Sequence, residues 1–207
     1  MARTGLISVV TPMHNEEGNA RAMYERTAAA MEGLEWELVV VDDGSKDATL
    51  AILEEIAAAD QRVKLVKLSR NFGHQAAITA GLEHATGEAV VMIDADLQDP
   101  PEVIPDMVRA WQGGSDVVYG VRASREGETK MKLLTAHLFY RMMARLAQID
   151  LPLDSGDFRL MDRRALEVLL NMPERNRFLR GMTVWIGFTQ TALPYKRDAR
   201  VAGETKF

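Results

Sequence analysis

Apolar extended runs alternate with helical stretches along the first half of the chain, and this alternation restricts the fold more than any other feature. A chain of this kind builds a parallel sheet whose strands are joined by crossover helices. We therefore predict an α/β fold with a mostly parallel central sheet flanked by helices, and the length of 207 residues predicts one domain. The extended runs are Leu6–Thr11, Trp36–Val41, Val63–Leu68 and Ala89–Ile93.

Acidic residues follow the last of these runs directly, in the sequence AVVMIDADLQDPP at residues 89–101. Successive side chains of an extended chain point to opposite faces, so Asp94 and Asp96 are expected to face one point. Open α/β sheets bind ligands at the carboxyl ends of their strands, and a hard divalent cation prefers a few oxygen ligands beside phosphate and water. Asp94, Asp96 and the amide oxygen of Gln98 are therefore candidate metal ligands. An acidic turn before a helix that starts at Pro100–Pro101 fits the same residues.

Two other strand ends also carry polar residues, and a parallel sheet brings all of these ends to one edge. The first holds Pro12 with Asn15 and Glu16, and Asn15 is also a candidate cap for the helix that follows. The second is Asp42–Ser45. Within it, Asp43 is suited to accept the hydrogen bonds of a uracil or guanine base, or alternatively to shape the turn.

The chain contains neither GxGxxG nor GxxxxGK[ST], so no glycine-rich loop is available to hold a pyrophosphate. A bound pyrophosphate would need a metal and cations such as Arg70. This requirement favours a metal site over a simple turn for the acidic pair. His74 is interpreted as the first residue of a helix and is left outside the predicted site.

Composition excludes several classes of protein. The net charge of −5 argues against a general nucleic-acid binder, and the absence of cysteine excludes disulfides and thiolate metal sites. No apolar run has the length needed to cross a bilayer, and the first strand begins too early for a signal peptide. The polar stretch Arg122–Lys130 predicts an exposed loop. The helix predicted at Met131–Ile149 has a wide apolar face flanked by cations, which suits a membrane surface. A helix that packs in the core with its charges in solvent fits the same residues and is the preferred interpretation.

Five segments spread over nearly the whole chain carry a family resemblance. They are VVTPMHNEE, VVVDDGSKDAT, LSRNFGHQAAITAGLEHATGEAVVMIDADLQDPPE, SGDFRLMDR and RFLRGM, at residues 9–17, 39–49, 68–102, 155–163 and 177–182. Together they resemble the family-two inverting glycosyltransferases of GT-A fold. The likeness is strongest to the subgroup that moves a sugar from a nucleotide diphosphate to a polyprenyl phosphate, including dolichyl-phosphate mannosyltransferases and bactoprenol glucosyltransferases.

The resemblance implies one GT-A catalytic domain, with a nucleotide-sugar-binding half at residues 1–121 and an acceptor-side half at residues 122–207. It also implies that Asp94, Asp96 and Gln98 hold Mg²⁺ or Mn²⁺ with the donor diphosphate, and that Asp157 lies near the acceptor. The predicted catalytic residues are Asp96, Arg122 and Asp157. The predicted substrate-binding residues are Pro12, Asn15, Glu16, Asp43, Arg70, Gly73, Asp94, Arg159, Arg200 and Lys206.

The mechanism implied is one in-line displacement at the anomeric carbon with inversion, and the acceptor decides the role of Asp157. A phosphate monoester has a second pKa of about 6 and is already ionised, so Asp157 would orient it, while Arg122, Arg125 and Arg141 would hold it. A sugar hydroxyl would instead need Asp157 as its base. A non-catalytic nucleotide-sugar-binding module is a further alternative. A sugar-nucleotide pyrophosphorylase would need a glycine-rich loop, which residues 12–18 lack.

Members of this subgroup often continue into membrane helices, whereas this chain stops at Phe207, within the matched segment Ala202–Phe207. We expect a catalytic domain of a longer protein, or else a soluble relative with peripheral membrane contact, on the cytoplasmic side of the membrane. The expected partners are a UDP-sugar or GDP-mannose, undecaprenyl or dolichyl phosphate, and a membrane surface. No nucleic acid is expected, and a homo-oligomer is left open.

Overall fold

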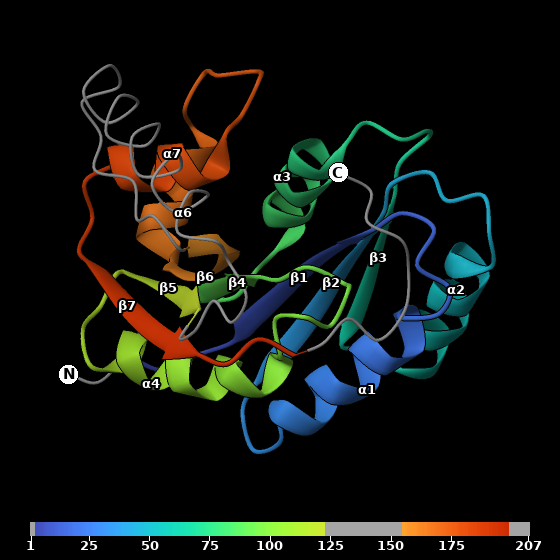
Figure 1. Ribbon diagram of the computed structural model, residues 1–207, viewed down its shortest axis with the longest axis horizontal. Helices are drawn as coiled ribbons and strands as arrows, with labels where there is room; N and C mark the ends of the chain where they lie inside the picture. The colour runs from blue at the N-terminus through green and yellow to red at the C-terminus, as the bar shows by residue number, and fades with distance from the viewer. Residues whose placement is uncertain (1–2, 123–154, 199–207) are drawn as a thin grey trace, which may run out of the picture.

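A computed structural model describes residues 3–122 and 155–198 of the protein, in which seven strands form one sheet (Figure 1). The strands are β1 (Ile7–Met13), β2 (Trp36–Asp42), β3 (Val63–Lys67), β4 (Ala89–Met92), β5 (Val117–Arg122), β6 (Ser155–Asp162) and β7 (Gln190–Tyr195). Their order in the sheet is β3-β2-β1-β4-β6-β5-β7. The predicted α/β fold with a mostly parallel central sheet is confirmed.

Strand β6 is the exception to the parallel arrangement, because it runs antiparallel to both of its neighbours, β4 and β5. The strands β3, β2, β1 and β4 are parallel to one another, and β7 is parallel to β5. The chain thus inserts a strand from its second half directly beside the acidic strand of its first half.

Helices cover both faces of the sheet (Figure 1). One face carries α1 (Ala20–Ala30), α2 (Thr49–Ala59) and α4 (Ile104–Gln112), the last preceded by a 3₁₀ turn at Pro101–Val103. The other face carries α3 (His74–His84), α6 (Arg163–Leu170) and α7 (Leu179–Trp185). None of the helices in the described ranges combines the length and the apolar character that are needed to cross a membrane.

Alternate residues of the central strands fill two cores, one on each face of the sheet. Val9 and Val91 pack against the first helix layer, and Val10 and Val90 against the second, all with 0% exposure. This double burial explains why the strands are apolar without interruption. Helix α3 lies very close to β1, since a Cβ added to Gly81 would meet Val10 Cγ1 at 2.4 Å.

The predicted cap at Asn15 is wrong. Helix α1 begins at Ala20, after Asn19, and Asn15 adopts a left-handed backbone with φ 54°. The Asn15 side chain instead accepts a hydrogen bond of 2.8 Å from the backbone N–H of Lys46, which ties the end of β1 to the turn after β2. The Met131–Ile149 helix, most of the Arg122–Lys130 loop, the Ala202–Phe207 segment, and residues Arg125, Arg141, Arg200 and Lys206 lie outside the described residues.

Candidate active site

The carboxyl ends of β1, β2 and β4 meet at one edge of the sheet, as predicted. The pairing sets Met13 beside Asp42 and Val10 beside Met92, and the N–H of Ile93 continues the ladder to the carbonyl of Val10 over 3.0 Å. The polar residues that follow each strand are thereby brought to the same edge.

Exposure alternates along the turn that follows β4. Asp94, Asp96 and Gln98 are partly exposed, whereas the residues between them, Ala95 and Leu97, are buried. Leu97 has a left-handed backbone with φ 58°, so the chain turns here and does not continue as a strand. The three predicted metal ligands therefore share the accessible side of this turn.

The oxygen atoms of this turn suit a cation. Asp94 Oδ1 is buried and accepts no hydrogen bond, although His74 Nε2 lies 3.3 Å away, and Asp96 Oδ1 accepts one of 3.1 Å from the N–H of Gln98. Burial, together with the nearby Asp99, Asp157 and Asp96 carboxylates, raises the pKa of Asp94 to about 6 against the opposing charge of His74. Over the described residues, no group of three His, Cys, Asp or Glu side chains forms a metal cage.

Asp157 lies next to these acids because β6 pairs with β4. The register sets Arg159 opposite Met92, so Asp157, two residues before Arg159, and Asp94, two residues after Met92, leave the paired strands at the same end. His74 Nε2 lies 3.3 Å from Asp94 Oδ1 and 3.5 Å from Asp157 Oδ2. The acid predicted to meet the acceptor and an acid predicted to hold the metal thus share one histidine neighbour.

Both carboxylate oxygens of Asp157 face donors from other elements. Oδ2 accepts a hydrogen bond of 3.1 Å from Gln75 Nε2, and Oδ1 lies 3.6 Å from Arg180 Nε. Burial opposes ionisation, but the His74 contact and the charges of Arg180 and Arg159 outweigh it and lower the pKa of Asp157 to about 2. Burial alone would lower the pKa of His74. The neighbouring carboxylates of Asp157 and Asp94 outweigh burial, so the pKa of His74 is raised.

A hollow of about 550 Å³ opens beside the ends of β1 and β2. Its lining includes the predicted Arg70, whose guanidinium carbon lies 3.9 Å from the ring centre of Phe72. The lining also includes Asp42 but not Asp43. Asp43 is 3% exposed, and its two oxygens accept hydrogen bonds from the N–H groups of Phe72 over 2.7 Å and of Gly73 over 3.0 Å.

The remaining predicted residues near β1 and β2 have contacts of their own within this edge. Pro12 is buried in β1 and pairs with Val41. Asn15 donates its N–H to Ser45 Oγ over 3.0 Å, and the carboxylate of Glu16 accepts a hydrogen bond of 2.7 Å from Asn19 Nδ2. These contacts give the edge its shape, and substrate binding by these residues stays a prediction.

Arg122 and Arg159 have different surroundings. Arg122, at the end of β5, is partly exposed, and a Cβ added to Gly156 would lie 3.5 Å from its Nη2 and 3.9 Å from Asp99 Oδ2. Arg159 is only 2% exposed, and its guanidinium donates to Thr183 Oγ1 and, over 2.9 Å, to the carbonyl of Gly156. Burial lowers the pKa of Arg159 to about 10. Arg159 thus contacts protein groups from β6 and α7, and substrate binding by this residue stays a prediction.

Three residues at this edge were missed by sequence reasoning: His74, Gln75 and Arg180. The available signal for His74 was its position at the first turn of a helix that follows a strand of the same sheet edge. Nothing in the spacing of the sequence indicates that Gln75 and Arg180 approach Asp157.

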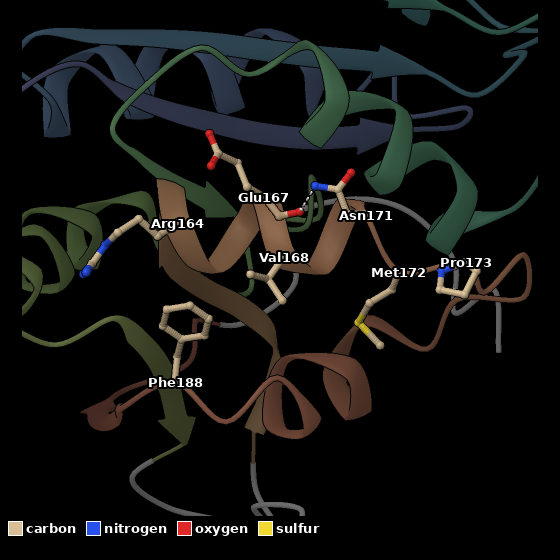
Figure 2. A pocket seen from close by; sticks show the side chains of 7 residues that line it. All are labelled: Arg164, Glu167, Val168, Asn171, Met172, Pro173 and Phe188. Atoms are coloured by element: carbon tan, nitrogen blue, oxygen red, sulfur yellow. Dashed lines mark hydrogen bonds between the residues drawn. The ribbon is translucent and has the colours of Figure 1, made fainter.

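A second hollow, of about 740 Å³, lies over the outer side of α6 (Figure 2). Val168, Met172 and Phe188 give it apolar walls, and the side chain of Asn171 donates to the carbonyl of Glu167 over 2.9 Å at its rim. None of its lining residues belongs to the acidic edge, so this hollow is separate from the candidate site.

Comparison with known proteins places this geometry in a family context. The family model described as "Glycosyl transferase family 2" matches residues 8–170. The chain is 49% identical over 209 residues to "Uncharacterized glycosyltransferase YkcC" of Bacillus subtilis (strain 168), covering 100% of this chain and 65% of that protein. It is 41% identical over 203 residues to "Prophage bactoprenol glucosyl transferase homolog" of Escherichia coli (strain K12), and the match covers 97% of this chain and 66% of that protein. The chain thus spans slightly less than two thirds of these relatives.

Solved structures share the fold. A mannosyltransferase from Pyrobaculum calidifontis, PcManGT, in complex with GDP-Man and Mn²⁺, superposes with a TM-score of 0.65 at 21% identity, covering 93% of this chain and 55% of that one. Glucosyl-3-phosphoglycerate synthase from Mycobacterium tuberculosis, in complex with Mn²⁺, UDP and glucosyl-3-phosphoglycerate, gives a TM-score of 0.61 at 24% identity, covering 97% and 73%. The sheet described above is that of GT-A glycosyltransferases.

Proposed function

We propose that this chain, which belongs to glycosyl transferase family 2, transfers one sugar from a nucleotide-diphosphate sugar to a polyprenyl phosphate. Membership of the family makes it a glycosyltransferase. The proposed acceptor is supported by the relatives named bactoprenol glucosyl transferase, which include one of Shigella phage SfX at 42% identity over 204 residues.

This proposal rests on one observation, namely that both oxygens of the Asp157 carboxylate face hydrogen-bond donors or a cation. Its oxygens face Gln75 at 3.1 Å and Arg180 at 3.6 Å, so it is held as an anion among donors. A hydroxyl acceptor needs a base with a pKa near the working pH, and a carboxylate whose pKa is about 2 is a poor one. A phosphate monoester is already ionised at neutral pH and needs no base.

The step that we propose balances without a proton transfer. A phosphate oxygen of the acceptor forms a bond to the anomeric carbon, the bond from that carbon to the donor diphosphate breaks, and the nucleoside diphosphate leaves with the electron pair. Arg180 and Arg122 would hold the acceptor phosphate. Asp157 would keep Arg180 in place and orient the acceptor by repulsion.

Asp94, Asp96 and Gln98 would hold Mg²⁺ or Mn²⁺. This assignment is supported by the buried Asp94 Oδ1, which accepts no hydrogen bond, and by the partly exposed positions of all three side chains. The two carboxylates and one amide leave coordination places for phosphate oxygens and water. When bound, the ion would offset the negative charge that develops on the leaving diphosphate.

The nucleoside would occupy the hollow beside β2, where Arg70 and Asp42 form part of the lining. This placement assigns the donor to residues 1–121 and the acceptor to residues 122–207, which contribute Asp157 and Arg180. Asp43 would not contact the nucleoside directly. It would hold Phe72 and Gly73 in place by accepting hydrogen bonds from their N–H groups. The protein would work at the cytoplasmic face of a membrane.

A transfer assay with matched acceptors tests this function. Radiolabelled UDP-glucose and GDP-mannose are each incubated with Mn²⁺ and a short polyprenyl phosphate, or with the corresponding polyprenol, which lacks the phosphate. We expect labelled product from the phosphate alone and with one of the two donors. Transfer to the polyprenol or to a saccharide hydroxyl, with none to the phosphate, would contradict the proposal, and donor binding without transfer would indicate a binding module.

A further inference from the structure

Two large aromatic side chains are exposed on one side of α7. Phe178, which precedes the helix, is 52% exposed, and Trp185, at its end, is 65% exposed. Seven residues correspond to about two helical turns, so both rings lie on the same side of the helix. The opposite side is buried, with Leu179 at 1% and Thr183 at 0% exposure. We call the side that carries Phe178 and Trp185 the α7 outer face.

The ring of Phe178 is held against the helix surface. A Cβ added to Gly181 would lie 2.7 Å from Cδ1 of Phe178, so the glycine leaves the space in which this ring lies. The Phe178 part of the α7 outer face is thus packed against its own helix.

The charge around α7 is opposite in sign to the charge of the whole protein. Residues 171–188 contain three arginines and one glutamate, a net charge of +2, in a chain whose net charge is −5. Arg175 is exposed, whereas Arg177 is fixed by its hydrogen bond of 2.9 Å to the carbonyl of Leu170. Aromatic rings beside arginines are typical of protein surfaces at the headgroup level of anionic membranes.

The start of α7 is also part of the wall beside Asp157. The N–H of Leu179 donates a hydrogen bond of 3.1 Å to Gln75 Oε1, and Arg180 Nε lies 3.6 Å from Asp157 Oδ1. A bilayer in contact with the α7 outer face would therefore lie next to the proposed acceptor site.

We propose that the α7 outer face docks on an anionic lipid bilayer, with Phe178 and Trp185 among the headgroups and the exposed Arg175 facing lipid phosphates. The choice of a bilayer rests on the proposed function, because a polyprenyl phosphate is presented to the enzyme from a membrane. The docking itself requires no acceptor lipid.

Fluorescence of the unmodified chain tests this docking. The chain has three tryptophans, and Trp36 and Trp111 are 4% and 2% exposed, so Trp185 is the exposed reporter. Vesicles of phosphatidylglycerol and phosphatidylcholine without polyprenyl phosphate should shift its emission to shorter wavelength, and brominated lipids should quench it. Unchanged emission and no quenching at saturating lipid would overturn the proposal.

Substitutions locate the contact. Phe178→Ser with Trp185→Ser should lower binding to these vesicles by about tenfold or more, measured by cosedimentation, because two apolar side chains no longer leave water. Phe72→Ser is the matched control, since Phe72 is 47% exposed and lies on the nucleotide side. An equal loss in both variants would overturn the proposal, as would a Trp185 blue shift caused by self-association without lipid.

The transfer assay with a short, water-soluble polyprenyl phosphate needs no bilayer, so it separates this inference from the proposed function. The double variant should keep its activity on that acceptor and lose activity on a long-chain polyprenyl phosphate embedded in vesicles. Vesicle binding in a chain that transfers no sugar would support the docking surface and refute the function. Sugar transfer by a chain that binds no vesicles would support the proposed function and refute the docking surface.

Discussion

Gln75 Nε2 donates a hydrogen bond of 3.1 Å to Asp157 Oδ2, and Oε1 of the same amide accepts one of 3.1 Å from the N–H of Leu179. One side chain at the start of α3 thereby joins β6 to α7. Because Gly73, two residues earlier, donates its N–H to Asp43, this short segment also fixes the end of β2. The segment therefore links the end of β2 to β6 and α7.

Gln75→Glu tests this connection. The substitution removes the donor to Asp157 and places a second negative charge beside it, so we expect kcat/KM for the acceptor to fall by about tenfold or more. Calorimetry should find donor binding nearly unchanged. Gln61→Glu, at an exposed position of the same residue type, is the control and should leave both quantities as they were. An unaltered kcat/KM in Gln75→Glu would remove Gln75 from the site.

Arg180 is expected to bind the acceptor phosphate. Arg180→Ala should raise the KM for polyprenyl phosphate about tenfold or more, with little change in the KM for the donor, because a charge-assisted contact is lost. Arg180→Lys keeps the charge, so its KM for polyprenyl phosphate should lie between that of the wild type and that of Arg180→Ala. Arg109→Ala, on α4 with a side chain 69% exposed, is the control. Equal increases in both KM values would argue for a general distortion.

The pKa of Asp157 predicts how stability depends on pH. Its folded-state value of about 2 lies below the ordinary 3.8, so the ionised group stabilises the fold above about pH 4, and this contribution disappears as the pH falls toward 2. A shift of this size corresponds to about 2 kcal/mol. In urea unfolding, Asp157→Asn should be less stable than the wild type at pH 7, and the difference should narrow near pH 2. A difference that is constant over this range would contradict the prediction, and Glu54→Gln, at an exposed position, is the control.

Asp96→Ala should remove the metal-dependent part of donor binding. In calorimetry with UDP-glucose or GDP-mannose, we expect Mn²⁺ to strengthen binding to the wild type, and this gain to fall about a hundredfold in the variant. When EDTA removes the metal, the wild type and Asp96→Ala should bind the donor with the same affinity. Glu54→Ala, an exposed carboxylate on α2, should respond to Mn²⁺ as the wild type does. Full activity of Asp96→Ala would exclude this residue from a metal site.

Much of the fold and part of the site follow from local sequence patterns. Uninterrupted apolar runs identify the four parallel strands, and the rule for strand ends in parallel sheets brings Asp42 and Asp94 to one edge. Asp94, Asp96 and Gln98 share the accessible side, as an extended chain would predict, although the chain turns at Leu97 and does not continue as a strand. These features depend on residues close together in the chain.

The rest depends on contacts between distant residues. Nothing within SGDFRLMDR indicates that β6 pairs with β4, so its sequence alone could not place Asp157 and Asp94 beside the same histidine. The hydrogen bond from Arg159 to Thr183 likewise joins β6 to α7 and has no counterpart in the local sequence pattern. His74 reads as a helix start, and only the tertiary structure directs it toward two carboxylates.

The insertion of β6 beside β4 has an evolutionary consequence. The candidate acidic residues belong to or directly follow the paired strands β4 and β6, whereas the walls of the hollow beside β2, such as Ser45, Lys46 and Asn71, belong to connecting loops. Loops tolerate substitution far better than the interior of a sheet. Under the proposed function, a lineage with this architecture can therefore exchange one nucleotide donor for another without rebuilding the paired strands that carry the proposed reaction centre.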